Sequence, residues 1–289
     1  MIFRRIIGFV LLLPVMATAA PNGPTPNGPA LGPLHIIGGP NTGGCIAGAV
    51  SLPLEGPGFQ TIHLDRSAFW GAPQTIAYLE LFGRQAVAAG LPTLLMEDIS
   101  KARGGPMPGG HVSHQIGLDA DVGLDMRARQ PLSAAERNTV ELRSLVRADG
   151  RDVDPSAWSP RVTTLLRVAA GLPEVDRILV NPAIKQQLCR EATGDRSWLH
   201  VIRPWYGHAA HMHIRFRCPA GQVDCVQTAP PPAGDGCDAT LQWWFDQLDV
   251  PARPTPPYKP PPVPVACRMI FANGRAGNDQ NPMIHPEGK

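Results

Sequence analysis

Six cysteines are the strongest constraint on how this chain of 289 residues can fold. An even number of cysteines in an exported chain predicts disulfides. A zinc ribbon is the competing interpretation, but it requires paired C-x-x-C spacings, which this sequence lacks. We therefore expect three disulfides, although six cysteines allow fifteen pairings and their spacing does not choose among them. The cysteines are Cys45, Cys189, Cys218, Cys225, Cys237 and Cys267.

The N-terminus indicates that the chain is exported. Arg4 and Arg5 precede an apolar run over residues 6–16, and the small residues Ala-Thr-Ala at 17–19 provide a cleavage signal. This pattern predicts a secretory signal peptide over residues 1–19. A membrane anchor is the weaker interpretation, because the run is about half of the ~20 residues that a spanning helix needs. No later segment is apolar enough to span a bilayer, so we expect no membrane span in the mature chain.

Composition and charge limit the class of protein and its partners. Hydrophobic residues make up 43% of the chain and charged residues 17%, which is an ordinary globular balance. The formal net charge of +2 is too small to suggest a surface that follows phosphates, and Lys and Arg do not cluster among aromatic residues. We therefore expect no nucleic-acid partner.

The chain divides into segments of different composition. Residues 20–44, rich in Pro, Gly and Asn at their start, are predicted to form an extended leader before a folded domain over residues 45–228. Residues 229–289 form a Pro-rich C-terminal region that includes KPPPVP, which favours stiff polyproline geometry. Since Cys267 lies beyond the prolines, a disulfide from it would tie this region back to the body.

Helical and strand patterns alternate through the middle of the chain. Helices are predicted from Pro73 to Ala89, from a Ser133 and Glu136 capping box to about Arg147, from Ser159 to Gly171, and from Asn181 toward Cys189. Strands are predicted over residues 93–96, 118–122, 177–180 and 211–217. We find no internal repeat. This mixture predicts an α+β fold, with flanking helices on a central antiparallel sheet that is polar on one face.

Five of the nine histidines fall in two short segments. His111 and His114 belong to the first segment, and His208, His211 and His213 to the second. A strand presents residues i and i+2 on one face, so His211 and His213 should emerge side by side. Asp119 and Asp121 should share a face for the same reason.

This clustering indicates a metal site. Catalytic zinc takes three protein ligands and keeps a fourth position for water, whose pKa it lowers to about 7. A histidine from a glycine-rich loop, an aspartate from the next strand and a histidine from a second strand would meet that need. The natural set is His114, Asp121 and His213. Asp119 is kept outside it, as a solvated carboxylate or one that orients a ligand histidine.

Three strings carry a resemblance to a known family: GGHVSHQIGLDADV, RILVNPAIKQQLC and RPWYGHAAHMHIRFRCP. The H-x6-D spacing from His114 to Asp121, joined to H-x-H at residues 211–213, resembles the ligand pattern of the metallopeptidase clan that includes D-Ala-D-Ala carboxypeptidases and lysostaphin. With the strings in this order, the chain resembles the penicillin-insensitive murein endopeptidase family from about residue 44 to residue 267.

The resemblance implies a periplasmic zinc endopeptidase that hydrolyses peptidoglycan cross-bridges between D-alanine and meso-diaminopimelate. It implies that His114, Asp121 and His213 bind the catalytic zinc. His211 would be the general base or the group that stabilises the transition state, with His208 beside it. A D-alanyl-D-alanine metallo-carboxypeptidase and a non-catalytic peptidoglycan-binding protein are the alternative functions.

The resemblance also implies the disulfides and a second metal site. The cysteine pairs would be Cys45–Cys267, Cys189–Cys237 and Cys218–Cys225. The second metal would use His111 and Asp149, although His111 could equally position a substrate. The family's remaining ligand is the histidine of a D-G-x-H segment, whereas this chain reads DGRD, with Asp152 in that place. Asp152 can ligate through oxygen, so it is kept as a candidate ligand.

Some residues near these motifs receive weaker interpretations. Trp205 and Tyr206 lie just before the histidine strand and are candidates for lining a substrate groove. The remaining histidines have no companion residues at useful spacing, and we treat them as ordinary; they are His35, His63, His200 and His285.

Overall fold

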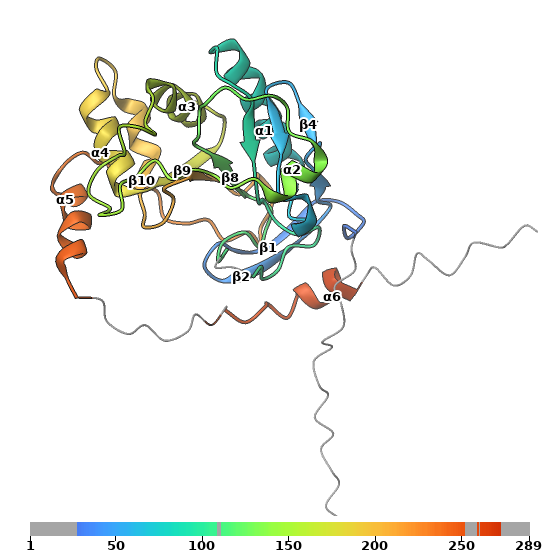
Figure 1. Ribbon diagram of the computed structural model, residues 1–289. Coiled ribbons are helices and arrows are strands. Elements are labelled where there is room, and N and C mark those ends of the chain that lie inside the picture. The colour runs from blue at the N-terminus through green and yellow to red at the C-terminus, as the bar shows by residue number, and fades with distance from the viewer. Residues whose placement is uncertain (1–27, 109–110, 252–258, 260, 273–289) are drawn as a thin grey trace, which may run out of the picture.

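A seven-stranded sheet forms the middle of the protein (Figure 1). The computed structural model describes residues 28–108, 111–251, 259 and 261–272. In spatial order the strands are β10 (Ile202–Pro204), β9 (Val175–Val180), β11 (His211–Phe216), β8 (Asp119–Gly123), β7 (Leu94–Met96), β5 (Phe59–Thr61) and β4 (Glu55–Gly56). The central pairs from β9 to β7 are antiparallel, while β10 with β9 and β5 with β7 are parallel. The predicted central antiparallel sheet is confirmed, and parallel pairs extend it on both sides.

Helices cover one face of this sheet. The described helices are α1 (Pro73–Ala88), α2 (Ala134–Thr139), α3 (Pro160–Ala170), α4 (Pro182–Glu191), α5 (Ala239–Asp246) and α6 (Cys267–Ala272), with 3-10 turns η1 (Leu64–Arg66), η2 (Ser197–Val201) and η3 (Gln247–Asp249). Figure 1 shows α1, α3 and α4 on the same side of the sheet. The predicted α+β fold is therefore confirmed. Among the described residues, no helix combines the length and apolar character needed to cross a bilayer.

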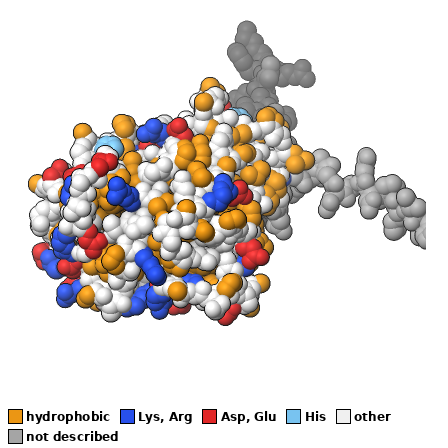
Figure 2. Space-filling model, turned by 90° about the horizontal axis from the view of Figure 1, so that it is seen from above, with side chains coloured by type: hydrophobic (Ala, Val, Ile, Leu, Met, Phe, Trp, Pro, Cys, Tyr) orange, Lys and Arg blue, Asp and Glu red, His pale blue; other side chains and the backbone are white. Residues whose placement is uncertain are grey.

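Alternation along β11 separates the core from the polar face. Met212, Ile214 and Phe216 point to the helix side and are buried in the main apolar cluster with α1 and α3. Burying three such side chains contributes about 1.5–3 kcal/mol each to stability. His213 and Arg215 point to the opposite face, and this alternation fixes which face carries the chemistry. The helix side, seen from above in Figure 2, carries acidic and basic side chains interspersed with apolar ones.

A hairpin of β1 (His35–Gly39) and β2 (Gly43–Ala47) lies on the other side of the sheet (Figure 1). Its residues Ile36 and Ile46 are fully buried against Ile116 and Leu118. A side chain at Gly44 could not fit, since a Cβ there would lie 2.4 Å from Ile116 Cγ2. The predicted extended leader over residues 20–44 therefore ends in a strand, because residues 35–44 pair and pack as part of the folded body. A smaller antiparallel pair, β3 (Val50–Ser51) with β6 (Trp70–Gly71), lies nearby in sequence.

The prediction of a long helix after Ser133 is wrong. The capping box is present, with Ser133 and Glu136 bonded to each other's backbone, but α2 ends at Thr139 and Val140 adopts extended backbone. Beyond it, the Leu145 N–H donates to the Ala209 carbonyl and the side chain of Leu145 is fully buried. These tertiary contacts require an extended segment, so they override the local helix signal. The helices predicted to begin near 73, 160 and 182 are confirmed.

Three disulfides are present, and all three pairings implied by the resemblance are confirmed. They are Cys45–Cys267, Cys189–Cys237 and Cys218–Cys225. The first joins β2 to α6, where Cys45, Cys267 and Ile270 form a small buried cluster. Arg103 adds a hydrogen bond of 2.6 Å from Nη1 to the Ile270 carbonyl. The C-terminal region is thus tied to the body, while the predicted signal peptide at 1–19 lies outside the described residues.

We expect removal of Cys45–Cys267 to destabilise the protein more than removal of Cys218–Cys225. The first bond closes a loop with a sequence separation of 222 and the second a loop of 7. In the chain-entropy description these loops correspond to about 5 and about 2 kcal/mol. Paired Cys→Ala variants compared by urea denaturation would check this order. The variant without Cys45–Cys267 should also be cut faster by proteases around residue 267. Equal losses of unfolding free energy, or no faster cutting there, would contradict the prediction.

Candidate metal centre

Two adjacent strands and one loop bring together His114, Asp121 and His213. The register of β8 with β11 places Asp121 directly opposite His213, and His114 comes from the loop that leads into β8. Asp121 lies 3.2 Å from His114 Nε2 through Oδ2 and 3.0 Å from His213 Nδ1 through Oδ1. The two imidazole nitrogens are 3.1 Å apart. All three residues are at least 97% buried, so the cluster lies at the bottom of the face rather than on its surface.

The other ring nitrogens of the two histidines are held by buried acceptors. His114 Nδ1 donates to the Ile99 carbonyl at 3.0 Å, and His213 Nε2 donates to Asp119 Oδ1 at 2.7 Å. These contacts place a proton on His114 Nδ1 and on His213 Nε2, the nitrogens that face away from the cluster. In their neutral forms the rings would present lone pairs at His114 Nε2 and His213 Nδ1, as metal-ligating histidines do. Against the effect of burial, the Asp121 carboxylate raises the pKa of His114 to about 9, so the protonated Nε2 donates to Asp121.

The separations between these atoms fit a small metal ion. Ligands at 2.0–2.1 Å in a tetrahedron around zinc lie about 3.3 Å from one another. The separations of 3.0–3.2 Å between the cluster atoms are close to that value. Two imidazoles and one carboxylate leave a fourth position for a non-protein ligand. These donors are therefore compatible with a metal, and their role as ligands stays a prediction.

Charges in the cluster compensate one another. Burial favours the neutral carboxyl of Asp121, but the charge and hydrogen bond of His114 outweigh it and hold the pKa of Asp121 well below its usual range. Burial acts likewise on Asp119, but Arg215, whose Nε donates to Asp119 Oδ1 at 2.7 Å, and His213 lower its pKa to about 2. Both carboxylates are therefore ionised in the native state. They supply the negative charge that a buried divalent cation requires.

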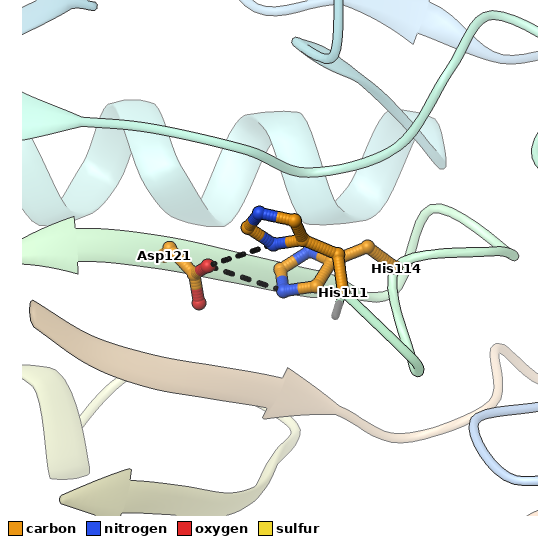
Figure 3. Close-up of side chains that lie close together, drawn as sticks. All are labelled: His111, His114 and Asp121. Carbon is orange, nitrogen blue, oxygen red and sulfur yellow. Dashed lines mark ion pairs between the residues drawn. The ribbon is translucent and has the colours of Figure 1, made fainter. Parts of the chain in front are cut away.

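His111 lies beside this cluster. Its Nδ1 is 3.8 Å from Asp121 Oδ2, and Figure 3 shows His111 and His114 turned toward the same carboxylate. His111, His114 and Asp121 are close enough to hold one metal ion between them. The other ring nitrogen of His111 is 3.4 Å from Asp98, which pairs with Arg66 at 2.7 Å. His111 can therefore reach the same metal position as the predicted ligands.

Asp149 and Asp152, the other predicted ligands of a second metal, pair with arginines and make no observed contact with the histidine cluster. Asp149 pairs with Arg147 at 3.4 Å, and Asp152 pairs with Arg190. Both carboxylates are well exposed, and neither is close enough to other potential ligands among the described side chains to form a group that could hold a metal ion. The second site with His111, Asp149 and Asp152 stays a prediction that this geometry does not support.

His211 and His208 lie on the open side of the cluster. His211 Nε2 is 3.8 Å from Asp121 Oδ2, and the ring is partly exposed. The His208 ring lies 5.4 Å from that of His211 and 5.8 Å from that of His213. Burial, with the charge of His213, lowers the pKa of His208 to about 4, and its Nδ1 donates to the Tyr206 carbonyl at 2.9 Å. A neutral ring so held keeps the Nε2 lone pair available.

Sequence reasoning missed Glu97 and undervalued His63. Glu97 is buried directly after β7, with Oε2 at 3.7 Å from His211 Nδ1 and Oε1 at 3.1 Å from His63 Nδ1. The neighbouring Glu97 carboxylate raises the pKa of His63. His63 therefore has a companion, contrary to the sequence prediction. The available signal was the pair of acidic residues, Glu97 and Asp98, directly after a predicted strand. They reach the site because β7 is next to β8 in the sheet.

The cluster opens into a cleft of about 950 Å³ on the non-helical face of the sheet. The floor is formed by side chains of β8, β9, β10 and β11. Its walls include the turn of the β1–β2 hairpin at residues 40–42, the loop at residues 226–232, and Trp205 and Trp244. Trp205 thus lines a groove as predicted, while Tyr206 Oη donates to the Trp244 carbonyl at 2.6 Å. The cleft is large enough to admit a peptide segment.

A buried set of two histidines and an aspartate beneath an open cleft is compatible with a metal-dependent hydrolase. The sequence profile of the penicillin-insensitive murein endopeptidase family matches residues 36–272. A penicillin-insensitive murein endopeptidase of Klebsiella pneumoniae is 43% identical over 270 residues, covering 91% of this chain and 96% of the relative. One of Haemophilus influenzae is 45% identical, covering 81% of each chain. The chain belongs to the penicillin-insensitive murein endopeptidase family, and it is a peptidase.

We expect Asp119→Asn to weaken metal binding without removing any of the three central donors. An amide is a weaker, uncharged acceptor for His213 Nε2, and such partners are worth about 10–100-fold in metal affinity. Competition with a chromophoric chelator for zinc would measure the loss. Asp125→Asn is the control, because Asp125 is a buried carboxylate that pairs instead with Arg127. Equal zinc affinity in both variants would contradict the assigned role of Asp119.

Proposed function

We propose that the protein is a periplasmic zinc endopeptidase that hydrolyses peptide cross-bridges of murein, of the type between D-alanine and meso-diaminopimelate. The observation that carries the proposal is the convergence of His114, Asp121 and His213 beneath an open cleft. The relatives, named murein endopeptidases, support the substrate class. The predicted signal peptide and the three disulfides support an oxidising compartment outside the cytoplasm.

His114, Asp121 and His213 would hold the zinc, which when bound supplies a Lewis acid and lowers the pKa of water. Asp119 and the Ile99 carbonyl keep both imidazoles aimed at the metal position. We base the proposal on one metal, because no observed contact joins Asp149 or Asp152 to the cluster.

His211 is the best placed group to handle protons. It emerges from β11 two residues before His213, on the same face, and its ring is partly exposed to the cleft. Glu97 lies behind its Nδ1 at 3.7 Å, which favours the orientation that directs Nε2 toward the cluster. His211 can then accept a proton from the attacking water and deliver it to the leaving amine. His208, neutral and held by Tyr206, lies next to it and limits its movement.

Direct attack by water fits the other groups in the cleft. All six cysteines are in disulfides, so none is a thiolate nucleophile. Ser113 Oγ lies 3.4 Å from His213 Nε2, but that nitrogen already faces Asp119 and is not free to act as a base. A reaction without an acyl-enzyme would give β-lactams no covalent intermediate to imitate.

Digestion of defined muropeptides tests the proposal. We expect cross-linked dimers to be converted to monomers, activity to be lost on chelation and zinc to restore it. His114→Ala and His213→Ala should abolish both zinc binding and activity with the fold retained. His211→Ala should lower kcat by about 10²–10⁴-fold while zinc binding is retained.

Other outcomes would favour the alternative functions. Release of terminal D-alanine from monomeric pentapeptides, with dimers left intact, would indicate a carboxypeptidase. Binding to cell wall without hydrolysis at full zinc loading would indicate a non-catalytic peptidoglycan-binding protein. Loss of zinc from the His211→Ala variant would contradict the separation of ligand and proton-transfer roles.

A further inference from the structure

One row of side chains crosses the floor of the cleft away from the metal centre. Arg203 on β10 is in register with Leu179 on β9, and Leu179 is in register with His213 on β11. Residues paired in this way point to the same face of a sheet. Neighbouring strands are about 4.8 Å apart, so the Arg203 backbone lies about 10 Å from that of His213. Both side chains line the same cleft.

Arginines dominate the charge on this floor. Arg177, Arg203 and Arg215 line the cleft, whereas Asp121 is the single acidic residue among its described lining side chains. Two of these arginines have partners. Arg177 bonds to Asp176 at 2.7 Å, and Arg215 bonds to Asp119 at 2.7 Å. In contrast to the mixed charges of the helix side (Figure 2), the cleft has an excess of positive charge.

Arg203 is the exception, because no acceptor in the described part of the chain is hydrogen-bonded to its guanidinium. Its Nη1 is buried without a hydrogen-bond partner among the described residues. Burial lowers the pKa of Arg203, and Asp238 is the acidic group that opposes this effect. Asp238 caps α5 through Oδ1, which accepts from the Thr240 N–H at 2.9 Å and from Thr240 Oγ1 at 2.6 Å, and no hydrogen bond joins it to Arg203 among the described residues. A partly buried cation without a partner is costly, and an anionic ligand would remove that cost.

The surroundings hold the guanidinium in place. Gly236 packs against it so closely that a Cβ there would lie 2.8 Å from Nη1. Lys185, buried nearby, donates to the Leu199 and Asp235 carbonyls at 2.9 and 2.5 Å. The charge of Arg203 adds to burial in lowering the pKa of Lys185 to about 7. Arg177 on the other side is also cationic, so the site attracts negative charge.

We propose that Arg203 forms a subsite for a free carboxylate of the peptide substrate, at a fixed distance from the metal centre. A guanidinium matches a carboxylate through two parallel N–H donors. The backbones of Arg203 and His213 are about 10 Å apart, which about three extended residues span. This is the interval between the strands, and the Arg203 side chain sets where the guanidinium lies within it. Stem peptides of murein carry free carboxylates within that distance of their cross-links. The exposed ring of Trp205, two residues after Arg203, provides an apolar wall beside the subsite. This inference rests on the proposed function for the identity of the ligand.

The test compares cross-linked muropeptide dimers with the same dimers whose stem carboxyl groups are amidated. With the zinc-loaded protein, we expect amidation to raise KM about 10–100-fold, because a hydrogen bond between charged groups is lost. The value of kcat should change little, since Arg203 is remote from the reacting bond. In the Arg203→Gln variant, KM for the free-acid dimer should rise to the value that the unmodified protein shows for the amidated dimer. This variant should therefore have the same KM for both dimers. Arg203→Lys should recover part of the preference, because it keeps the charge but not the paired donors.

Arg84→Gln is the matched control. It removes the same charge from an exposed position on α1, on the helix side of the sheet. We expect this variant to discriminate between the dimers as the unmodified protein does. Zinc content and circular dichroism of each variant separate a binding defect from misfolding. Equal KM values of the unmodified protein for both dimers, or preserved discrimination in Arg203→Gln, would overturn the inference.

The two proposals fail in distinguishable ways. If neither dimer is cleaved at full zinc loading, the proposed hydrolase function is wrong. Calorimetric binding of the same two dimers then decides the subsite independently. The subsite is supported if amidation weakens binding at least about tenfold in the unmodified protein and has no effect in the Arg203→Gln variant. Binding that is indifferent to amidation would refute it.

Discussion

The antiparallel pairing of β8 with β11 is the constraint on which the site depends. Its register sets Asp121 opposite His213 and Asp119 opposite Arg215. Because side chains alternate along a strand, a slip of β11 by one residue would send His213 and Arg215 to the helix side and expose Met212 and Ile214. Core burial on one face therefore enforces the arrangement of polar groups on the other. The site is rigid because these strands occupy the centre of the sheet, while His111, His114 and His208 come from loops.

The same register forces two carboxylates into a buried position, which requires nearby positive charge. Arg215 compensates Asp119, while His114 and His213 compensate Asp121. Breaking one partner would leave an uncompensated buried charge, which typically costs about 3–5 kcal/mol. A bound divalent cation would take over the compensation of Asp121 and favour the neutral form of His114, whose pKa the Asp121 carboxylate raises to about 9 against the effect of burial. Metal affinity should therefore be coupled to pH through displaced protons, as is general for such centres.

Sequence predicted the parts of this site that depend on local spacing. The alternation of HMHIRFR placed His211 and His213 on one face, and the distance from His114 to Asp121 allowed a loop and strand to converge. The pairing of strands distant in sequence could not be read in this way. Glu97 reaches His211 only because β7 neighbours β8, and Arg203 joins the cleft only because β9 lies between β10 and β11. The early end of α2 has the same origin, since Leu145 is drawn into contact with Ala209.

The arrangement of strands also sets the relation between recognition and hydrolysis. If substrate contacts were carried by loops, their distance from the metal centre could change with every loop length. Here the row from Arg203 through Leu179 and His213 to Asp121 is spaced by backbone hydrogen bonds, which fix the interval between strands. A peptide bound by its carboxylate at Arg203 would extend across the sheet toward the cluster. The loops at residues 40–42 and 226–232 can then select the shape of the substrate without altering the position of the bond to be cleaved.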